Sequence, residues 1–318
     1  MISNNQLHTS HSGTFRVGAH MSAAGGIHKA VERASAIGCN ALQVFSASPR
    51  TWRRSDLEKI VTPEIMKTQN QLDITPIVTH AMYLVNLASE NPDQLEKSRA
   101  VLEFDLKFDA KIGGAGVVVH LGSHLGRGWD AVKEQVAQQI TMILAATQAE
   151  FPESHFLIEN SAGQKGKLSS DLAEIRWLLD TIKNPRLGWC MDTCHAFAAG
   201  YSLSERVGEN LSLKTNTQKS ETMVQAITRY TLWSDLRVIH VNDSRDTFAS
   251  GADRHANIGE GSIPLEDFAH FLSQAAKYIQ QEDPKKQVPL ILEVPGQDDL
   301  GPDSINVQKI WDMVKKIK

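Results

Sequence analysis

The sequence CMDTCHAFAAG, residues 190–200, decides the fold of this chain and marks the place of its chemistry. The apolar run Leu187–Met191 predicts a buried strand, with Asp192 at its end and His195 three residues later in a turn. In parallel α/β folds the carboxyl ends of the strands carry the chemistry. A carboxylate and an imidazole that leave a strand end together suit a divalent metal such as zinc. Taken alone, Asp192 fits the cap of a following helix equally well.

Short apolar runs alternate with helical stretches along the rest of the chain. The predicted strands are Phe15–His20, Ala41–Phe45, Pro76–His80, Gly116–His120, Phe156–Glu159, Leu187–Asp192, Arg237–Asn242 and Pro289–Glu293. Apolar periodicity predicts helices around residues 27–37, 101–111, 132–144, 172–182 and 224–231. Eight strand-then-helix units predict an α/β fold, a TIM (β/α)₈ barrel with a metal site at the C-terminal face of its strands. A doubly wound sheet is the alternative, and it usually has fewer strands.

Length and composition agree with one catalytic domain. The 318 residues divide into a polar, flexible arm at 1–14 and a single barrel at 15–318, with a polar insertion at 202–222. No apolar run approaches the roughly 18 residues of a membrane span. Three cysteines are a sparse, odd count, which favours a reducing compartment. The formal charge of −4 argues against a polyanionic partner, unless bound divalent ions reverse the charge of one cleft.

Metal-ligand side chains recur at the predicted strand ends. They are His80, His120, Glu159, Asp192, His195, His240 and Glu293, to which the loop after the seventh strand adds Asp253 and His255. Nitrogen and oxygen donors of this kind suit zinc, manganese or iron better than calcium or magnesium. Nine ligands exceed the needs of one tetrahedral ion, so two or three ions are expected, with a carboxylate shared between two of them.

The other histidines have different expected roles. We expect no part in the site for five of them, because of their place in the arm or in helical and pre-strand segments: His8, His11, His28, His155 and His270. His20 and His124 lie near the predicted face and are left open between a supporting role and none. Cys194 is expected to be a buried thiol.

Several motifs together resemble the endonuclease IV family, metal-dependent apurinic/apyrimidinic endonucleases built on a TIM barrel. The most specific are DTCHAFAAGY (192–201) and DRHANIGEG (253–261). Supporting motifs are GAHMSAAGG (18–26), SPRTW (48–52), HAMYLVNLAS (80–89), HLGSHLG (120–126), IENSAGQ (158–164), HVNDS (240–244) and ILEVPG (291–296). The resemblance covers the chain from about Phe15 to Glu293.

The resemblance implies three zinc ions per chain, with manganese or iron at one position as a variant. The implied ligands are His80, His120 and Glu159 for the first ion, Glu159, Asp192, His240 and Glu293 for the second, and His195, Asp253 and His255 for the third. Glu159 and Glu293 would be catalytic, with Glu159 as the bridge. Arg50, Tyr83 and Leu84 align with residues that the family inserts into DNA, although Tyr83 and Leu84 also fit plain packing of a barrel loop.

The implied reaction is hydrolysis of the phosphodiester 5′ to an abasic site. It would leave a 3′-hydroxyl and a 5′-deoxyribose phosphate, and the same site would trim blocked 3′ ends. The nucleophile would be a hydroxide bridging two zincs, because zinc lowers the pKa of bound water to about 7. The implied partner is double-stranded DNA with abasic sites or blocked 3′ ends, read through its backbone and deformability. We expect no membrane partner, a monomer, and a cytoplasmic, nucleoid-associated address, or a nuclear or organellar one in a eukaryote.

Two alternative functions remain open. One is a metal-dependent sugar isomerase or epimerase of the same barrel superfamily, which holds one or two ions. The other is a non-catalytic damage-binding protein.

Three residues depart from the family pattern. They are Ala47 for a usual Lys, Leu121 for Pro and Lys165 for Gly. Loss of the lysine at position 47 would weaken a phosphate contact, which Lys165 would replace. None of the departures removes a ligand.

Overall fold

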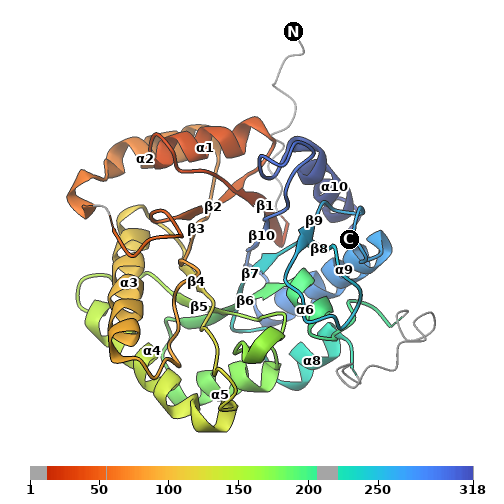
Figure 1. Ribbon diagram of the computed structural model, residues 1–318. Helices are drawn as coiled ribbons and strands as arrows, with labels where there is room; N and C mark the ends of the chain where they lie inside the picture. Colours follow the sequence, from red (N-terminus) through yellow and green to blue (C-terminus); the bar gives the residue numbers. More distant parts are fainter. Residues whose placement is uncertain (1–12, 55, 206–220, 318) are drawn as a thin grey trace.

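Eight parallel strands close into a barrel, which confirms the predicted TIM fold (Figure 1). The computed structural model describes residues 13–54, 56–205 and 221–317. Around the barrel the order is β1-β10-β7-β6-β5-β4-β3-β2. The bounds are β1 Phe15–His20, β2 Ala41–Phe45, β3 Ile77–His80, β4 Val117–Val119, β5 Phe156–Glu159, β6 Leu187–Asp192, β7 Leu236–His240 and β10 Val288–Leu292.

Helices form a ring around these strands (Figure 1). They are α1 Ile27–Ala36, α2 Thr62–Leu72, α3 Pro92–Lys111, α4 Lys133–Thr147, α5 Leu172–Ile182, α6 Thr193–Ala198, α8 Met223–Arg229, α9 Leu265–Glu282 and α10 Ser304–Val314. Short 3-10 helices lie at η1 Leu57–Lys59, η2 Trp129–Ala131 and η3 Gln164–Gly166. A two-stranded antiparallel sheet, β8 Asp243–Ser244 and β9 His255–Ala256, lies in the long segment after β7.

Every predicted strand is present, but several bounds were wrong by one or two residues. The strands β4, β7 and β10 end before His120, Asn242 and Glu293, so His120 and Glu293 stand just beyond their strands. Helix α3 begins nine residues earlier than predicted, at Pro92, because Asn91 caps it by accepting the backbone N–H groups of the next turn. No residue range was predicted for helices α2, α6, α9 and α10.

Two apolar layers hold the barrel together. The inner layer fills the barrel with one buried residue from each of seven strands: Ala41, Val78, Val118, Leu157, Cys190, Val238 and Ile291. The outer layer packs the other strand faces against the helices. On β1 the interior position is Gly18, where a Cβ would lie 2.6 Å from the carbonyl carbon of Ala41. The strands therefore approach too closely there for any larger residue.

The ends and the insertion are described only in part. The predicted arm at 1–14 lies outside the described residues except for Gly13 and Thr14, and the insertion at 202–222 lies outside them from 206 to 220. Where the insertion is described, Ser202 and Thr222 form a single parallel bridge, so its two described ends lie side by side. Among the described residues, no helix has the length and apolar content to cross a bilayer.

A buried carboxyl group on α3 ties the outer ring to the barrel. Asp109 is fully buried and accepts hydrogen bonds from Thr79 Oγ1 and Ser154 Oγ, each at 2.8 Å. Burial raises the pKa of Asp109 to about 7, and its hydrogen bonds offset only part of that effect. The folded chain therefore holds this proton to higher pH than the unfolded chain does.

Asp109→Asn should reveal this proton as a pH dependence of stability. Between the unfolded pKa of about 3.9 and the folded value the native state binds more protons, so stability falls as pH rises. We compare the free energy of unfolding of the unsubstituted chain with that of Asp109→Asn at each pH. The difference between the two should fall by about 2 kcal/mol from roughly pH 5 to pH 8, because only the unsubstituted chain loses this proton. Urea unfolding at each pH measures this, with the exposed Asp312→Asn as control. A difference that stays constant with pH would contradict the assignment.

Candidate metal centre

The structure brings all nine predicted ligands together at the carboxyl ends of the strands. Their donor atoms form three groups that match the three implied sets. Within each group, all the donor atoms lie within 4.8 Å of one another. In the first group His80 Nε2 and His120 Nε2 lie 3.3 and 3.2 Å from Glu159 Oε2. These three side chains come from the ends of the neighbouring strands β3, β4 and β5.

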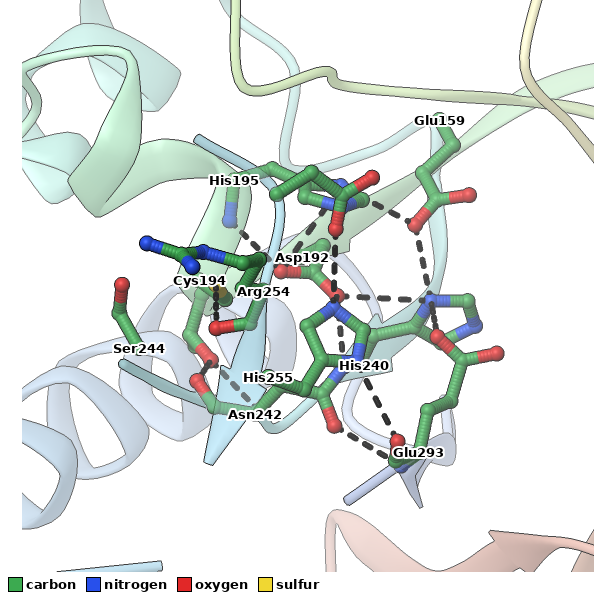
Figure 2. A network of polar contacts seen from close by, with 12 residues as sticks. Glu159, Asp192, Cys194, His195, His240, Asn242, Ser244, Arg254, His255 and Glu293 are labelled. Atoms are coloured by element: carbon green, nitrogen blue, oxygen red, sulfur yellow. Dashed lines mark hydrogen bonds and ion pairs between the residues drawn. The ribbon is translucent and has the colours of Figure 1, made fainter. Parts of the chain in front are cut away.

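The second group shares Glu159 with the first. His240 Nδ1 lies 3.0 Å from Glu159 Oε1, 3.3 Å from Glu293 Oε2 and 3.8 Å from Asp192 Oδ2 (Figure 2). Glu159 therefore turns one oxygen toward the first pair of imidazoles and the other toward His240. A carboxylate with this placement is suited to bridge two ions.

The third group joins α6 to the loop that ends in β9. His195 Nε2 lies 3.0 Å from Asp253 Oδ1, and His255 Nε2 lies 3.5 Å from the same oxygen. Lys167 Nζ lies 3.6 Å from Asp253 Oδ2, so this carboxylate also has a cationic neighbour.

Asp192 fits both interpretations of the opening motif. The predicted turn after it is in fact the short helix α6, and Asp192 Oδ1 caps that helix by accepting the backbone N–H of His195 at 2.8 Å. Its other oxygen accepts a hydrogen bond from Asn242 Nδ2 at 2.7 Å and faces His240. The cap therefore holds the carboxylate in position for the second group.

Backbone carbonyls orient three of the imidazoles. The Nδ1 atoms of His80, His195 and His255 lie 2.6, 2.9 and 3.2 Å from the carbonyl oxygens of Ala81, Asn160 and Glu293. A carbonyl only accepts, so each Nδ1 donates its proton and each Nε2 faces the carboxylates. Nε2 of His255 is buried without a hydrogen-bond partner among the described residues, and Nε2 of His195 lies 3.0 Å from Asp253 Oδ1. Buried ring nitrogens that face carboxylates in this way fit metal ligands.

The charges of the cluster also favour the binding of cations. Burial opposes the ionisation of Glu159, but the imidazoles of His120 and His240 outweigh it and hold the pKa of Glu159 well below its usual range. Burial likewise opposes protonation of His195, but Asp192 and Asp253 hold its pKa well above the usual value. The ionised carboxylates keep the buried imidazole protonated. A divalent ion that binds here can replace that proton, which is then released.

Two cysteines lie beside the cluster as buried, protonated thiols. Cys190 falls within reach of Glu159 and His240, and Cys194 within reach of Asp192 and His255. Burial raises the pKa of each thiol to about 12, whereas only a thiolate binds metal well. Cys194 is therefore a buried thiol, as predicted.

The two undecided histidines have separate roles. His124 Nδ1 accepts the backbone N–H groups of Gly126 and Gly128, both at 3.1 Å, so it shapes its own loop and belongs to none of the clusters of the described residues. His20 Nδ1 lies 2.9 Å from Gln43 Nε2, at the edge of the second group. His28, His155 and His270 lie outside the clusters, and His8 and His11 lie outside the described residues.

Several supporting residues were missed in the sequence. Asn160 exchanges hydrogen bonds with the backbone of Asp192, and Asn242 Oδ1 accepts the backbone N–H of Glu293. Both follow a strand end within two residues of a predicted ligand, which was the available signal. Gln43 is a polar residue within the apolar strand ALQVF, and this interruption was its only signal.

Of the three predicted DNA-contacting residues, Tyr83 lines the pocket of the metal centre, and Leu84 and Arg50 are exposed. A pocket of about 300 Å³ is lined by Tyr83 together with ligands of all three groups. Tyr83 is 60% and Leu84 40% exposed, and the Tyr83 ring stands edge-on to Phe45 at 5.5 Å. Arg50 is exposed and lines a neighbouring pocket of about 680 Å³. Tyr83 therefore packs against Phe45 and is also exposed at the pocket, so it fits both interpretations of this residue.

The three departures from the family pattern affect the site unequally. Leu121 is 1% exposed and belongs to the apolar core, so it takes no part in the rim. Ala47 lines the pocket beside Arg50, where it offers no charge. The side chain of Lys165 lies outside the described residues.

The chain is similar in sequence and in fold to known proteins. Residues 31–314 match the family model described as xylose isomerase-like TIM barrel. A probable endonuclease 4 from Methanoculleus marisnigri is 35% identical over 93% of this chain and 98% of its own length. The structure of endonuclease IV from Thermus thermophilus is similar with a TM-score of 0.73 and 30% identity, over 95% of this chain and 99% of that one. A D-tagatose 3-epimerase-like protein, at 15% identity, TM-score 0.63 and coverages of 95% and 97%, shares the fold.

Proposed function

This chain belongs to the endonuclease IV family, within the xylose isomerase-like TIM barrels, and on that premise we propose that it cleaves DNA at abasic sites. The bond hydrolysed is the phosphodiester 5′ to the lesion, which leaves a 3′-hydroxyl and a 5′-deoxyribose phosphate. Blocked 3′ ends are trimmed at the same site. The cofactor is three zinc ions, with manganese or iron accepted at one position.

The observation that carries this proposal is the sharing of Glu159 between two donor groups that open into one pocket. Bound divalent ions supply charge that stabilises a transferring phosphate, and they lower the pKa of water to near neutral. The chain supplies four carboxylates and five imidazoles, most of them oriented by backbone or amide groups before any substrate binds. This preorganisation is what electrostatic stabilisation of a phosphodiester transition state requires.

Three exposed residues, Tyr83, Leu84 and Arg50, select the abasic site over normal DNA in this proposal. Tyr83 and Leu84 follow the ligand His80 within four residues, so a duplex that reaches the pocket must meet them. Apolar and aromatic wedges unstack bases at a cost of a few kcal/mol, which is lower where a base is missing. Exposed Arg50 on the neighbouring loop adds a positive charge for the DNA backbone.

A sugar isomerase or epimerase is the second candidate, because such proteins share the barrel. The third donor group argues against it. His195, Asp253 and His255 form a further set beside the two that share Glu159, and a site for one or two ions does not use it. A non-catalytic damage-binding protein would not need the open pocket that the three groups line.

Cleavage of a duplex that carries one tetrahydrofuran abasic analogue tests the proposal. With zinc supplied, we expect one incision, on the 5′ side of the analogue, and no incision of the same duplex without the lesion. The new 3′ end should be extended by a polymerase, as a 3′-hydroxyl is. An intact lesion strand, together with turnover of a ketose or aldose, would favour the epimerase instead.

A further inference from the structure

Gln43 points into the barrel and contacts two of the nine proposed ligands, Glu293 and His240. It lies in the middle of β2 and is fully buried. Its Nε2 lies 2.6 Å from Glu293 Oε1, and its Oε1 lies 2.8 Å from His240 Nε2. β2 is not a neighbour of β7, since β1 and β10 lie between them. The side chain therefore reaches from β2 to one proposed ligand at the end of β7 and to another just after β10.

The chemistry of these contacts fixes every proton in the chain of hydrogen bonds. The carboxylate of Glu293 can only accept, so the amide nitrogen of Gln43 must face it and donate. The second N–H of the amide is then available to His20 Nδ1 at 2.9 Å. The amide oxygen is left for His240, and because that oxygen can only accept, His240 Nε2 must donate. The proton of a neutral His240 therefore resides on Nε2, and Nδ1 is the nitrogen that faces Glu159 and Glu293.

His240 differs in this respect from the imidazoles that the backbone orients. His80, His195 and His255 bond a carbonyl through Nδ1 and present Nε2. His240 presents the opposite nitrogen, and within the described residues no backbone carbonyl holds its outer nitrogen. We infer that Gln43 is a positioning residue, whose side-chain amide selects the His240 tautomer and orientation that ligate a metal through Nδ1, and at the same time holds Glu293. This inference rests on the proposed metal centre.

Removal of the amide should weaken one ion and spare the others. Without an acceptor for Nε2, His240 can exchange between tautomers and rotate, and Glu293 loses its donor. Loss of a partner that orients a metal ligand typically lowers metal affinity about 10- to 100-fold. The ion held by Glu159, Asp192, His240 and Glu293 should be the one affected, because the other two groups have no contact with Gln43 among the described residues.

Zinc competition with a chelator, on the full chain, measures the first consequence. Gln43→Met has a similar shape but no N–H donor and no oxygen acceptor, so one of the bound zincs should be released at about 10- to 100-fold lower chelator strength than in the original chain. Gln139→Met is the matched control, since Gln139 is a buried glutamine on α4 whose Oε1 has no hydrogen-bond partner in the part of the chain that the structure describes. An unchanged release profile in Gln43→Met, or an equal loss in Gln139→Met, would overturn the inference.

The second consequence is the tautomer of His240, which nuclear magnetic resonance of ¹⁵N-histidine measures in the zinc-loaded chain. If Gln43 only supported the fold, its replacement would not change this tautomer. His240 should carry its proton on Nε2 in the original chain and in Gln43→Glu, where one proton shared with Glu293 leaves a carboxyl oxygen to accept from His240 Nε2. Gln43→Met should lose that single tautomer. If Gln43→Met does not fold, a Gln43→Glu chain in which His240 loses its Nε2 proton still overturns the inference. An original chain that binds no zinc through His240 would instead contradict the metal centre itself, so the two failures are distinguishable.

Discussion

Glu159→Gln should lower the rate of abasic-site cleavage on the order of 10³-fold or more. Removal of a single preorganised group at a reaction centre commonly costs about 10²- to 10³-fold, and this substitution affects two donor groups at once. The amide keeps the shape of the side chain but lacks its charge, while His80, His120 and His240 all lie within 3.3 Å of its oxygens. Affinity for abasic DNA should change less than about 10-fold, because backbone attraction survives.

Single-turnover cleavage and filter binding on one duplex separate these two effects. His124→Ala is the control, because His124 accepts only backbone N–H groups of its own loop through Nδ1. This variant should keep the full metal content. Loss of zinc from His124→Ala, or a Glu159→Gln chain that binds DNA weakly but cleaves at the original rate, would show that the ligand assignment is wrong.

The double change Tyr83→Ala with Leu84→Gly should lower cleavage of an abasic site in an intact duplex on the order of 10²-fold, since misplacement of a substrate costs about that much. Both side chains are exposed and belong to neither apolar layer, so their removal leaves the barrel core intact. Removal of a 3′-phosphate at a gap should suffer far less, because the DNA there is already flexible.

Comparison of the two substrates, with zinc content measured in parallel, decides the role of this loop. Zinc should remain at the level of the original chain, although the Tyr83 ring lies 5.9 Å from that of His80. Equal losses on both substrates would mean that Tyr83 and Leu84 only support the rim of the pocket. The wedge would then have to be sought elsewhere on this face.

The barrel, and the convergence of the candidate ligands at one end of it, could be predicted because both follow from local pattern. Each strand is a short apolar run, and a titratable side chain at its carboxyl end must lie at the same mouth as the others. The resemblance to endonuclease IV, confirmed by the relatives, rests on motifs around those same side chains. The allocation of nine donors to three groups came from the resemblance, and the geometry agrees with it.

What escaped prediction depends on contacts between distant segments. Gln43 and His240 are 197 residues apart, so nothing in the strand ALQVF indicates that its glutamine meets that imidazole. The nine-residue error at the start of α3 has a different cause. Residues 92–100 are largely polar and lack an apolar stripe, so their helix depends on the Asn91 cap and on Pro92 in the first turn. The helix α6 was missed because its six residues are too few for a periodic pattern.

The metal content of the purified chain tests the central claim most directly. Nine ligands in three groups, with Glu159 shared, predict close to three ions per chain when the protein is prepared without chelator. Mass spectrometry of the intact, native chain should show this count, with zinc predominant, and the count should fall in step with cleavage activity as chelator is added. A single ion per chain at full activity would contradict the trinuclear centre.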